Sequence, residues 1–165
     1  MVNNNNEQDM VNKLVSNYTS IKFVYQNVKK NPDVGFSGQI DGNNYFFILE
    51  AKKYNKDNRS NYPKQLLTEI LINRDCISKK VIENNSDNPE SYGILLSFDN
   101  GKTDGIYDFL KAHITLDDWN KFGDLYNCQY VFLYDETGEK LYFQEWENFL
   151  VSCNPTEYIC NQNEG

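Results

Sequence analysis

The sequence predicts an α/β fold in which one mixed central β-sheet is flanked by helices. Helix-like and strand-like hydrophobic periodicities alternate along the chain. Strand-like runs separated by helical ones imply a mixed sheet with helices packed against it. With 165 residues, the chain has room for one domain with a proper core, and we find no repeat or long linker. We therefore expect a single domain over residues 1–165.

The first third of the chain predicts a helix followed by three strands. From Glu7 onward, apolar residues recur at steps of three and four, which is typical of one helix face. Residues 21–26 alternate between apolar and polar and predict a strand, and residues 33–40 predict a second one, weakened by glycine. Asp-Gly within 41–44 favours a hairpin turn. The strand at 45–51 is apolar on both faces and is therefore expected at the centre of the sheet.

The rest of the chain predicts a long helix, a buried strand and a helical and hairpin extension. Pro63 suits the first turn of the long helix. We expect a core over residues 7–98, an extension over 99–154 and a loosely held tail over 155–165. The elements expected from residue 62 onward are the long helix 62–83, the strand 91–98, short helices at 103–113 and 115–126, and hairpin strands at 128–134 and 140–146.

Several classes of protein are disfavoured by composition. No run approaches the roughly 18 apolar residues of a membrane span, and the N-terminus lacks a basic start and an apolar stretch, so we expect a cytoplasmic protein without membrane contact. The four cysteines form no CxxC pair, and His113 has no cysteine at zinc-ligand spacing.

The charge is distributed unevenly. The formal net charge is −8, yet residues 22–80 hold eleven Lys and Arg against six Asp and Glu, an excess of five positive charges. A local basic surface can dock a phosphate backbone even on an acidic protein, because salt confines charge effects to about 10 Å. The alternative is that these lysines only solvate a loop, and charge alone does not decide between the two.

Residues that could perform chemistry follow the most apolar run. Side chains alternate along a strand, so Glu50 and Lys52 share a face, and Asp33 lies beside them if the two strands pair antiparallel. Two carboxylates and an ammonium suit phosphodiester hydrolysis, in which Mg²⁺ held by carboxylates activates water and neutralises developing charge. The alternative is a common Pro-Asp turn beside a charged sheet edge.

These residues resemble the PD-(D/E)XK nuclease superfamily, which has the restriction-endonuclease-like fold. "PD" stands at 32–33, sixteen residues follow, and "EAK" stands at 50–52, within the order helix, three strands, helix, strand. The resemblance covers about residues 7–98. It implies that Asp33 and Glu50 bind Mg²⁺, or Mn²⁺ in its place, together with the backbone carbonyl of Ala51, and that Lys52 is catalytic.

The resemblance gives meaning to further positions. It suggests Glu7, on the first helix, as an additional metal ligand, although a carboxylate is also favourable at any helix N-terminus. It suggests Gln65, on the helix after the lysine, as a catalytic residue. The Gln-x-x-x-Tyr pattern of the RecB-like branch is absent because position 69 is Glu. The basic residues expected to contact nucleic acid are Lys53, Lys56, Arg59 and Lys64.

The expected function is therefore a Mg²⁺-dependent nuclease that hydrolyses DNA or RNA, with DNA as the expected partner. Two alternatives stay open. The chain could be a non-catalytic module of the same fold that binds nucleic acid or protein. It could also be an inhibitor that presents its acidic C-terminal part to a basic partner. The sequence does not decide whether the chain acts alone or as a homodimer.

Overall fold

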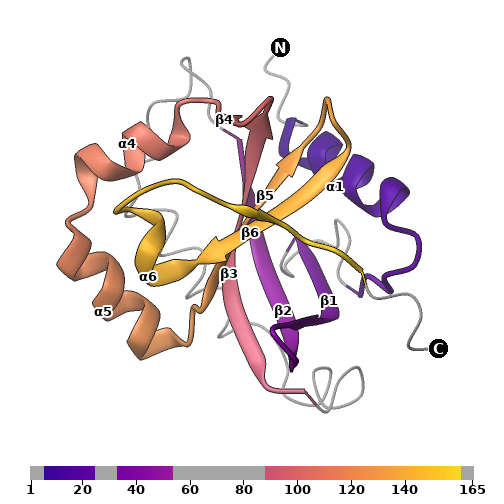
Figure 1. The fold of residues 1–165 in the computed structure, drawn as a ribbon, viewed down its shortest axis with the longest axis horizontal. Coiled ribbons are helices and arrows are strands. Elements are labelled where there is room, and N and C mark those ends of the chain that lie inside the picture. The colour runs from indigo at the N-terminus through magenta and orange to yellow at the C-terminus, as the bar shows by residue number, and fades with distance from the viewer. Residues whose placement is uncertain (1–5, 25–32, 54–87, 161–165) are drawn as a thin grey trace.

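A computed structural model describes residues 6–24, 33–53 and 88–160. In these residues seven strands form one mixed sheet in the order β1-β2-β3-β5-β6-β7, with β4 paired to β3, and helices lie on both sides of it (Figure 1). The predicted fold class, a mixed sheet flanked by helices, is confirmed. The strands are β1 Val34–Ile40, β2 Asn43–Lys52, β3 Glu90–Asp99, β4 Lys102–Thr103, β5 Tyr130–Asp135, β6 Lys140–Glu145 and β7 Thr156–Glu157.

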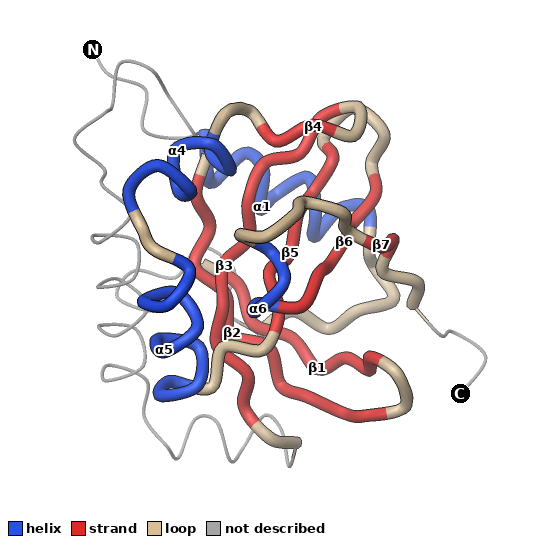
Figure 2. The backbone as a smooth tube through the Cα atoms, turned by 60° about the vertical axis from the view of Figure 1, so that its left-hand side comes forward, coloured by secondary structure: helices blue, strands red, loops and turns tan. Residues whose placement is uncertain are grey.

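The helices divide between the two faces of the sheet. They are α1 Asn6–Asn17, α4 Ile106–His113, α5 Leu116–Tyr126 and α6 Trp146–Phe149. The helix α1 covers one face, where Met10 and Leu14 pack into a core cluster with Leu49 and Phe132. The helices α4, α5 and α6 cover the other face, where Trp119 packs with residues of β2, β3 and β5 (Figure 2).

Strand directions agree with the connections between them. The strands β1 and β2 are antiparallel and joined by a tight turn, whereas β2 with β3 and β3 with β5 are parallel. Parallel neighbours need a long crossover, and α4 and α5 supply the one between β3 and β5. The terminal hairpin therefore extends the central sheet, since β5 lies directly beside β3.

Local sequence explains several boundaries. Asp41 and Gly42 have φ values of 52° and 80°, so the turn between β1 and β2 has positive φ at both central residues, as a two-residue hairpin favours. The hydroxyl of Thr115 accepts a hydrogen bond from the Asp118 N–H and caps α5, and Asn127 ends that helix with φ 57°.

The predicted helix at the N-terminus, the strands at 33–40, 45–51 and 91–98, the two short helices and the terminal hairpin are confirmed to within a few residues. The predicted strand at 21–26 is wrong for its described part. Only a single bridge joins Phe23 to Phe36, with the Val24 N–H donating to the Gly35 carbonyl. An extended segment that pairs with the edge of a sheet at a single residue can show the same alternation of apolar and polar side chains as a full strand.

The C-terminal tail and the long helix were also predicted from the sequence. Within the tail predicted to be loose from residue 155, Thr156 and Glu157 pair with β6, and Tyr158 is only 5% exposed. The predicted long helix over 62–83 lies outside the described residues. Within the part of the chain that is described, no helix is long and apolar enough to cross a bilayer.

A stacked pair of indoles anchors α5 and α6 to the sheet. The rings of Trp119 and Trp146 lie 3.9 Å apart with planes 5° from parallel. Each indole N–H donates to the backbone carbonyl of the other tryptophan, at 2.7 and 2.8 Å. Gly123 on α5 leaves the space for this arrangement, because a Cβ there would lie 2.5 Å from Cδ1 of Trp146 and 3.1 Å from the Cys128 carbonyl oxygen.

We predict that Gly123→Ala destabilises the protein by about 1–3 kcal/mol, because the added methyl overpacks the Trp146 ring. The sign is diagnostic, since alanine normally stabilises a helix interior by about 0.5–1 kcal/mol relative to glycine. Urea unfolding measures the change. The control is Asp124→Ala, at an exposed position one residue further along α5. A Gly123→Ala protein as stable as the parent would contradict the packing described.

We also predict that stability falls above about pH 10, in part through Tyr158. Burial raises the pKa of Tyr158 to about 12, while its hydroxyl accepts a hydrogen bond from the Gln39 N–H. Because the folded-state pKa lies above the unfolded value near 10, the unfolded state loses its proton first. The stabilisation is complete below pH 10 and is lost as pH rises toward 12.

Unfolding measured from pH 8 to 11.5 tests this prediction, with Tyr158→Phe as the comparison. The variant should show a shallower decline, with a difference of up to about 2 kcal/mol across the range. Equal slopes for the two proteins would show that Tyr158 does not contribute.

Candidate active site

The register of β1 and β2 brings the predicted catalytic residues to one end of the sheet. Val34 pairs with Leu49, and both pack in the core cluster on the α1 side. Asp33 directly precedes Val34, so the same register places it next to Glu50. Because faces alternate along a strand, Asp33, Glu50 and Lys52 belong to the face opposite Leu49. The predicted sharing of a face by Glu50 and Lys52 agrees with this pairing.

A hydrogen bond joins the two segments of the motif. The backbone N–H of Ala51, between Glu50 and Lys52, donates to Oδ2 of Asp33 at 2.9 Å. Ala51 is fully buried, so its N–H depends on this acceptor. The N–H and C=O of one strand residue point to the same side, so the Ala51 carbonyl also faces the Asp33 side of β2. Asp33 thereby continues the β1–β2 pairing past the end of β1.

Glu7 reaches the same strand end from the first turn of α1. Its Oε2 accepts a hydrogen bond from the Lys53 N–H at 3.3 Å and lies 3.9 Å from Nζ of Lys52. The Lys52 side chain is only 14% exposed. A carboxylate on the first helix therefore lies beside the predicted catalytic lysine, and the role of Glu7 as a metal ligand stays a prediction.

The side chain of Lys53 lies against an acidic residue that sequence reasoning missed. Nζ of Lys53 lies 2.5 Å from Oε2 of Glu136, and Nζ of Lys13 lies 3.3 Å from Oε1 of the same carboxylate. Glu136 follows β5 in the chain, 83 positions after Lys53. No local motif could have revealed this contact, because it depends on β5 lying two strands away from β2 in the sheet.

Four of the predicted site residues lie outside the described part of the chain. They are Lys56, Arg59, Lys64 and Gln65. Their roles in contacting nucleic acid and in catalysis stay predictions.

The donor set at the strand end suits a hard divalent cation. The described residues contain no group of three or more His, Cys, Asp and Glu side chains arranged around a metal position. Two carboxylates and one backbone carbonyl are nevertheless what Mg²⁺ uses, because it keeps several waters and takes few protein oxygens. Asp33, Glu50 and the Ala51 carbonyl therefore fit Mg²⁺ or Mn²⁺.

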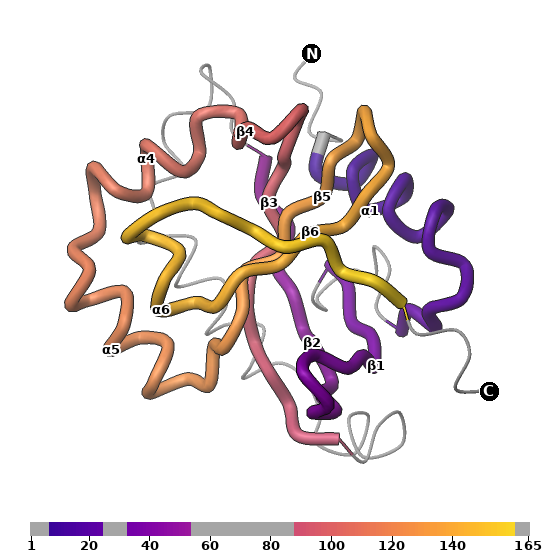
Figure 3. The backbone as a smooth tube through the Cα atoms, viewed as in Figure 1, coloured from indigo at the N-terminus to yellow at the C-terminus, as the bar shows by residue number. Residues whose placement is uncertain are grey.

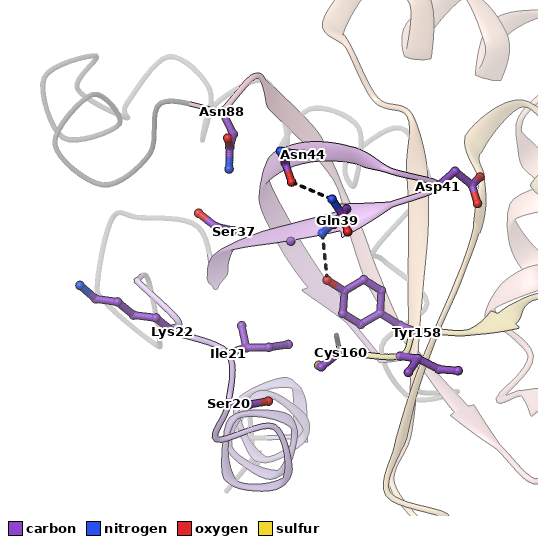
Figure 4. A pocket seen from close by; sticks show the side chains of 12 residues that line it. Ser20, Ile21, Lys22, Ser37, Gln39, Asp41, Asn44, Asn88, Tyr158 and Cys160 are labelled. Carbon is purple, nitrogen blue, oxygen red and sulfur yellow. Dashed lines mark hydrogen bonds between the residues drawn. The ribbon is translucent and has the colours of Figure 1, made fainter. Parts of the chain in front are cut away.

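A polar pocket of about 400 Å³ lies near the other end of β1 and shares no residue with this site (Figure 4). Ser37 and Gln39 of β1 line it, together with Lys22, Asn88 and Tyr158. The Gln39 side-chain amide donates to Asn44, and its backbone N–H donates to the Tyr158 hydroxyl. Some polar groups that line the pocket are therefore hydrogen-bonded to each other.

We predict that Asp33→Ala lowers stability by about 1–3 kcal/mol, because it leaves the buried Ala51 N–H without its acceptor. Asp33→Asn should lose much less, since the amide oxygen can accept the same hydrogen bond. Chemical denaturation of the two variants without divalent ions measures the difference. Equal stabilities would show that the bond to Ala51 does not hold the motif together.

The comparisons with known proteins give no sequence relative and two structural ones. No protein-family model matches the chain, and no curated protein matches it significantly. Two solved structures of the restriction endonuclease FokI are similar to it. One is FokI bound to DNA, with a TM-score of 0.45, 13% identity, and coverage of 80% of this chain and 22% of the FokI chain. The other is FokI, with a TM-score of 0.46, 14% identity, and coverage of 81% and 23%. The chain thus spans less than a quarter of the FokI chain.

Proposed function

We propose that the chain is a metal-dependent nuclease that hydrolyses phosphodiester bonds, with DNA as its expected substrate. The observation that carries the proposal is the junction of Asp33 with the Glu50–Lys52 segment, where a hydrogen bond to Ala51 sets two carboxylates and a lysine at one strand end. Strands β1 and β2 both pack in the core, so the side chains that would meet substrate lie at the ends of buried strands.

The carboxylates of Asp33 and Glu50 are the groups that we propose to bind a cation. Asp33 and Glu50, with the Ala51 carbonyl, would hold the metal, which when bound would neutralise charge on the phosphate and lower the pKa of a coordinated water. The Asp33 carboxylate is oriented by the Ala51 N–H, and Glu50 is fixed by its place in the paired part of β2.

Lys52 is the residue that we propose to act on the reacting phosphate. It is the last residue of β2, it shares the face of Glu50, and its ammonium is largely sheltered beside Glu7. An ammonium there can donate to a non-bridging phosphate oxygen and to the attacking water. It then stabilises the charge that grows as water adds to phosphorus and the bond to the leaving oxygen breaks.

The basic residues beyond β2 are proposed to follow the nucleic-acid backbone. The Lys53 ammonium has a carboxylate partner in the free protein. We therefore expect most of the phosphate contacts to come from Lys56, Arg59 and Lys64. Each phosphate that they neutralise should add about one unit to the slope of log affinity against log salt.

We predict that the purified chain cleaves DNA with Mg²⁺ or Mn²⁺ and that a chelator abolishes cleavage. Lys52→Met should lower the rate at least about a hundredfold while DNA binding persists, because its ammonium matters mainly in the transition state. Asp33→Asn and Glu50→Gln should lose both metal binding and cleavage. Nicking of supercoiled plasmid and degradation of labelled RNA measure the activity, and calorimetry with Mn²⁺ measures metal binding.

The matched control is Lys140→Met, at an exposed lysine of β6 that lies 3.9 Å from Glu157. It makes the same chemical change away from the site, and a nuclease contaminant would survive in both lysine variants alike. Cleavage unaffected by chelator or by Lys52→Met would overturn the mechanism. DNA binding by the parent without cleavage would favour a non-catalytic module, and absence of both would favour an acidic interaction protein.

A further inference from the structure

The tip of the β5–β6 hairpin reaches the candidate active site from the far end of the sequence. In Figure 3 the orange turn between β5 and β6 lies beside the indigo helix α1. Glu136, in that turn, lies between two lysines: its Oε2 is 2.5 Å from Lys53 and its Oε1 is 3.3 Å from Lys13 on α1. The Glu136 side chain is 14% exposed, so both ion pairs are partly shielded from solvent.

The turn that carries Glu136 is itself held in place. The neighbouring Asp135 is buried, and its Oδ1 accepts hydrogen bonds from the N–H groups of Thr137 and Gly138 at 3.0 and 2.9 Å. A Cβ at Gly138 would lie 2.6 Å from the same carboxylate. The carboxylate of Glu136 is therefore presented from a fixed turn, not from a loose loop.

Residue 53 is restrained at two points by two different elements. Its backbone N–H donates to Glu7 of α1, and its ammonium pairs with Glu136 of the hairpin. The strand ends one residue earlier, at Lys52, so these two contacts fix the point where β2 leaves the sheet. The same Glu7 oxygen that accepts the Lys53 N–H lies 3.9 Å from the Lys52 ammonium.

We propose that Glu136 is a positioning residue for the active site, acting through Lys53 and Glu7 to hold the Lys52 side chain in its reactive place. This rests on the proposed nuclease function. The C-terminal hairpin is then part of the catalytic framework, although it lies outside the segment that resembles a nuclease. The contact has a second consequence, because the Glu136 carboxylate neutralises two ammonium groups that would otherwise attract a phosphate backbone.

These two roles predict that loss of the Glu136 charge lowers kcat but raises the affinity for DNA. In Glu136→Gln the strand end loosens, so kcat should fall about tenfold, because small displacements of a catalytic group are costly. The freed Lys53 and Lys13 ammonium groups should at the same time tighten DNA binding and steepen its salt dependence by up to about two units. A purely structural role would weaken kcat and DNA binding together and would lower the thermal midpoint.

The test combines a charge-matched control with a double-mutant cycle. Asp117→Asn makes the same charge change and removes an ion pair with Lys121, but both of those side chains are more than 70% exposed and lie on α5. It should leave kcat and the salt slope within about twofold of the parent. Glu136→Asp, which keeps the charge, should restore part of kcat. Lys53→Met should lower kcat as Glu136→Gln does, and the double variant should be no slower than either single one.

Amide hydrogen exchange separates this inference from the proposed nuclease function. In Glu136→Gln the Lys53 amide, bonded to Glu7, should exchange at least about fivefold faster, whereas core amides of β3 and β5 stay unchanged. If the parent cleaves nothing, the nuclease proposal fails and the exchange measurement still decides whether Glu136 fixes the strand end. Unchanged exchange at Lys53, or a kcat equal to the parent's, would overturn the positioning role.

Discussion

The antiparallel register between β1 and β2 is the constraint on which the candidate site depends. Pairing of Val34 with Leu49 places both of these side chains in the core under α1. It also puts Asp33 next to Glu50, with the Ala51 N–H bonded to the Asp33 carboxylate. A slip of one residue would turn Leu49 away from α1 and Glu50 toward it, so the packing under α1 decides which side chains reach the site. The tight turn at Asp41 and Gly42 leaves no slack for such a slip.

Features set by neighbouring residues could be predicted from the sequence, whereas features set by contacts between distant residues could not. The strand at 45–51 was predictable because its apolar run is continuous, and the turn at 41–44 because Asp-Gly tolerates positive φ. The strand prediction failed over residues 21–24 because alternation of apolar and polar residues indicates which side chains are exposed, but not whether the backbone pairs with a neighbouring strand. Within this segment only Phe23 has a bridge. Tyr158 was missed because its short segment has no hydrophobic periodicity, and its burial against Phe36 and Phe132 becomes visible only in three dimensions.

The same distinction applies to the site. Asp33, Glu50 and Lys52 could be grouped from the sequence because they lie on two adjacent strands joined by a two-residue turn. Glu136 could not, because its approach to Lys53 requires the crossover that sets β5 beside β3, followed by a turn fixed by Asp135. Long-range contacts of this kind follow from topology, which local patterns do not encode. Through the pairing of β5 with β3, the predicted extension over 99–154 is joined closely to the sheet.

Charge near the site also differs from what a residue count suggests. The basic excess over residues 22–80 includes Lys52 and Lys53, yet both have carboxylate partners, Glu7 and Glu136, that lie outside that segment. If the proposed function is right, a phosphate backbone would have to compete with those carboxylates for the two ammonium groups. Glu136 is moreover part of the acidic C-terminal region, and its charge is neutralised within the molecule by Lys53 and Lys13. Because Glu136 already pairs with these two lysines, it is not available to attract a basic partner, which weighs against treating the acidic region as one uniform docking surface.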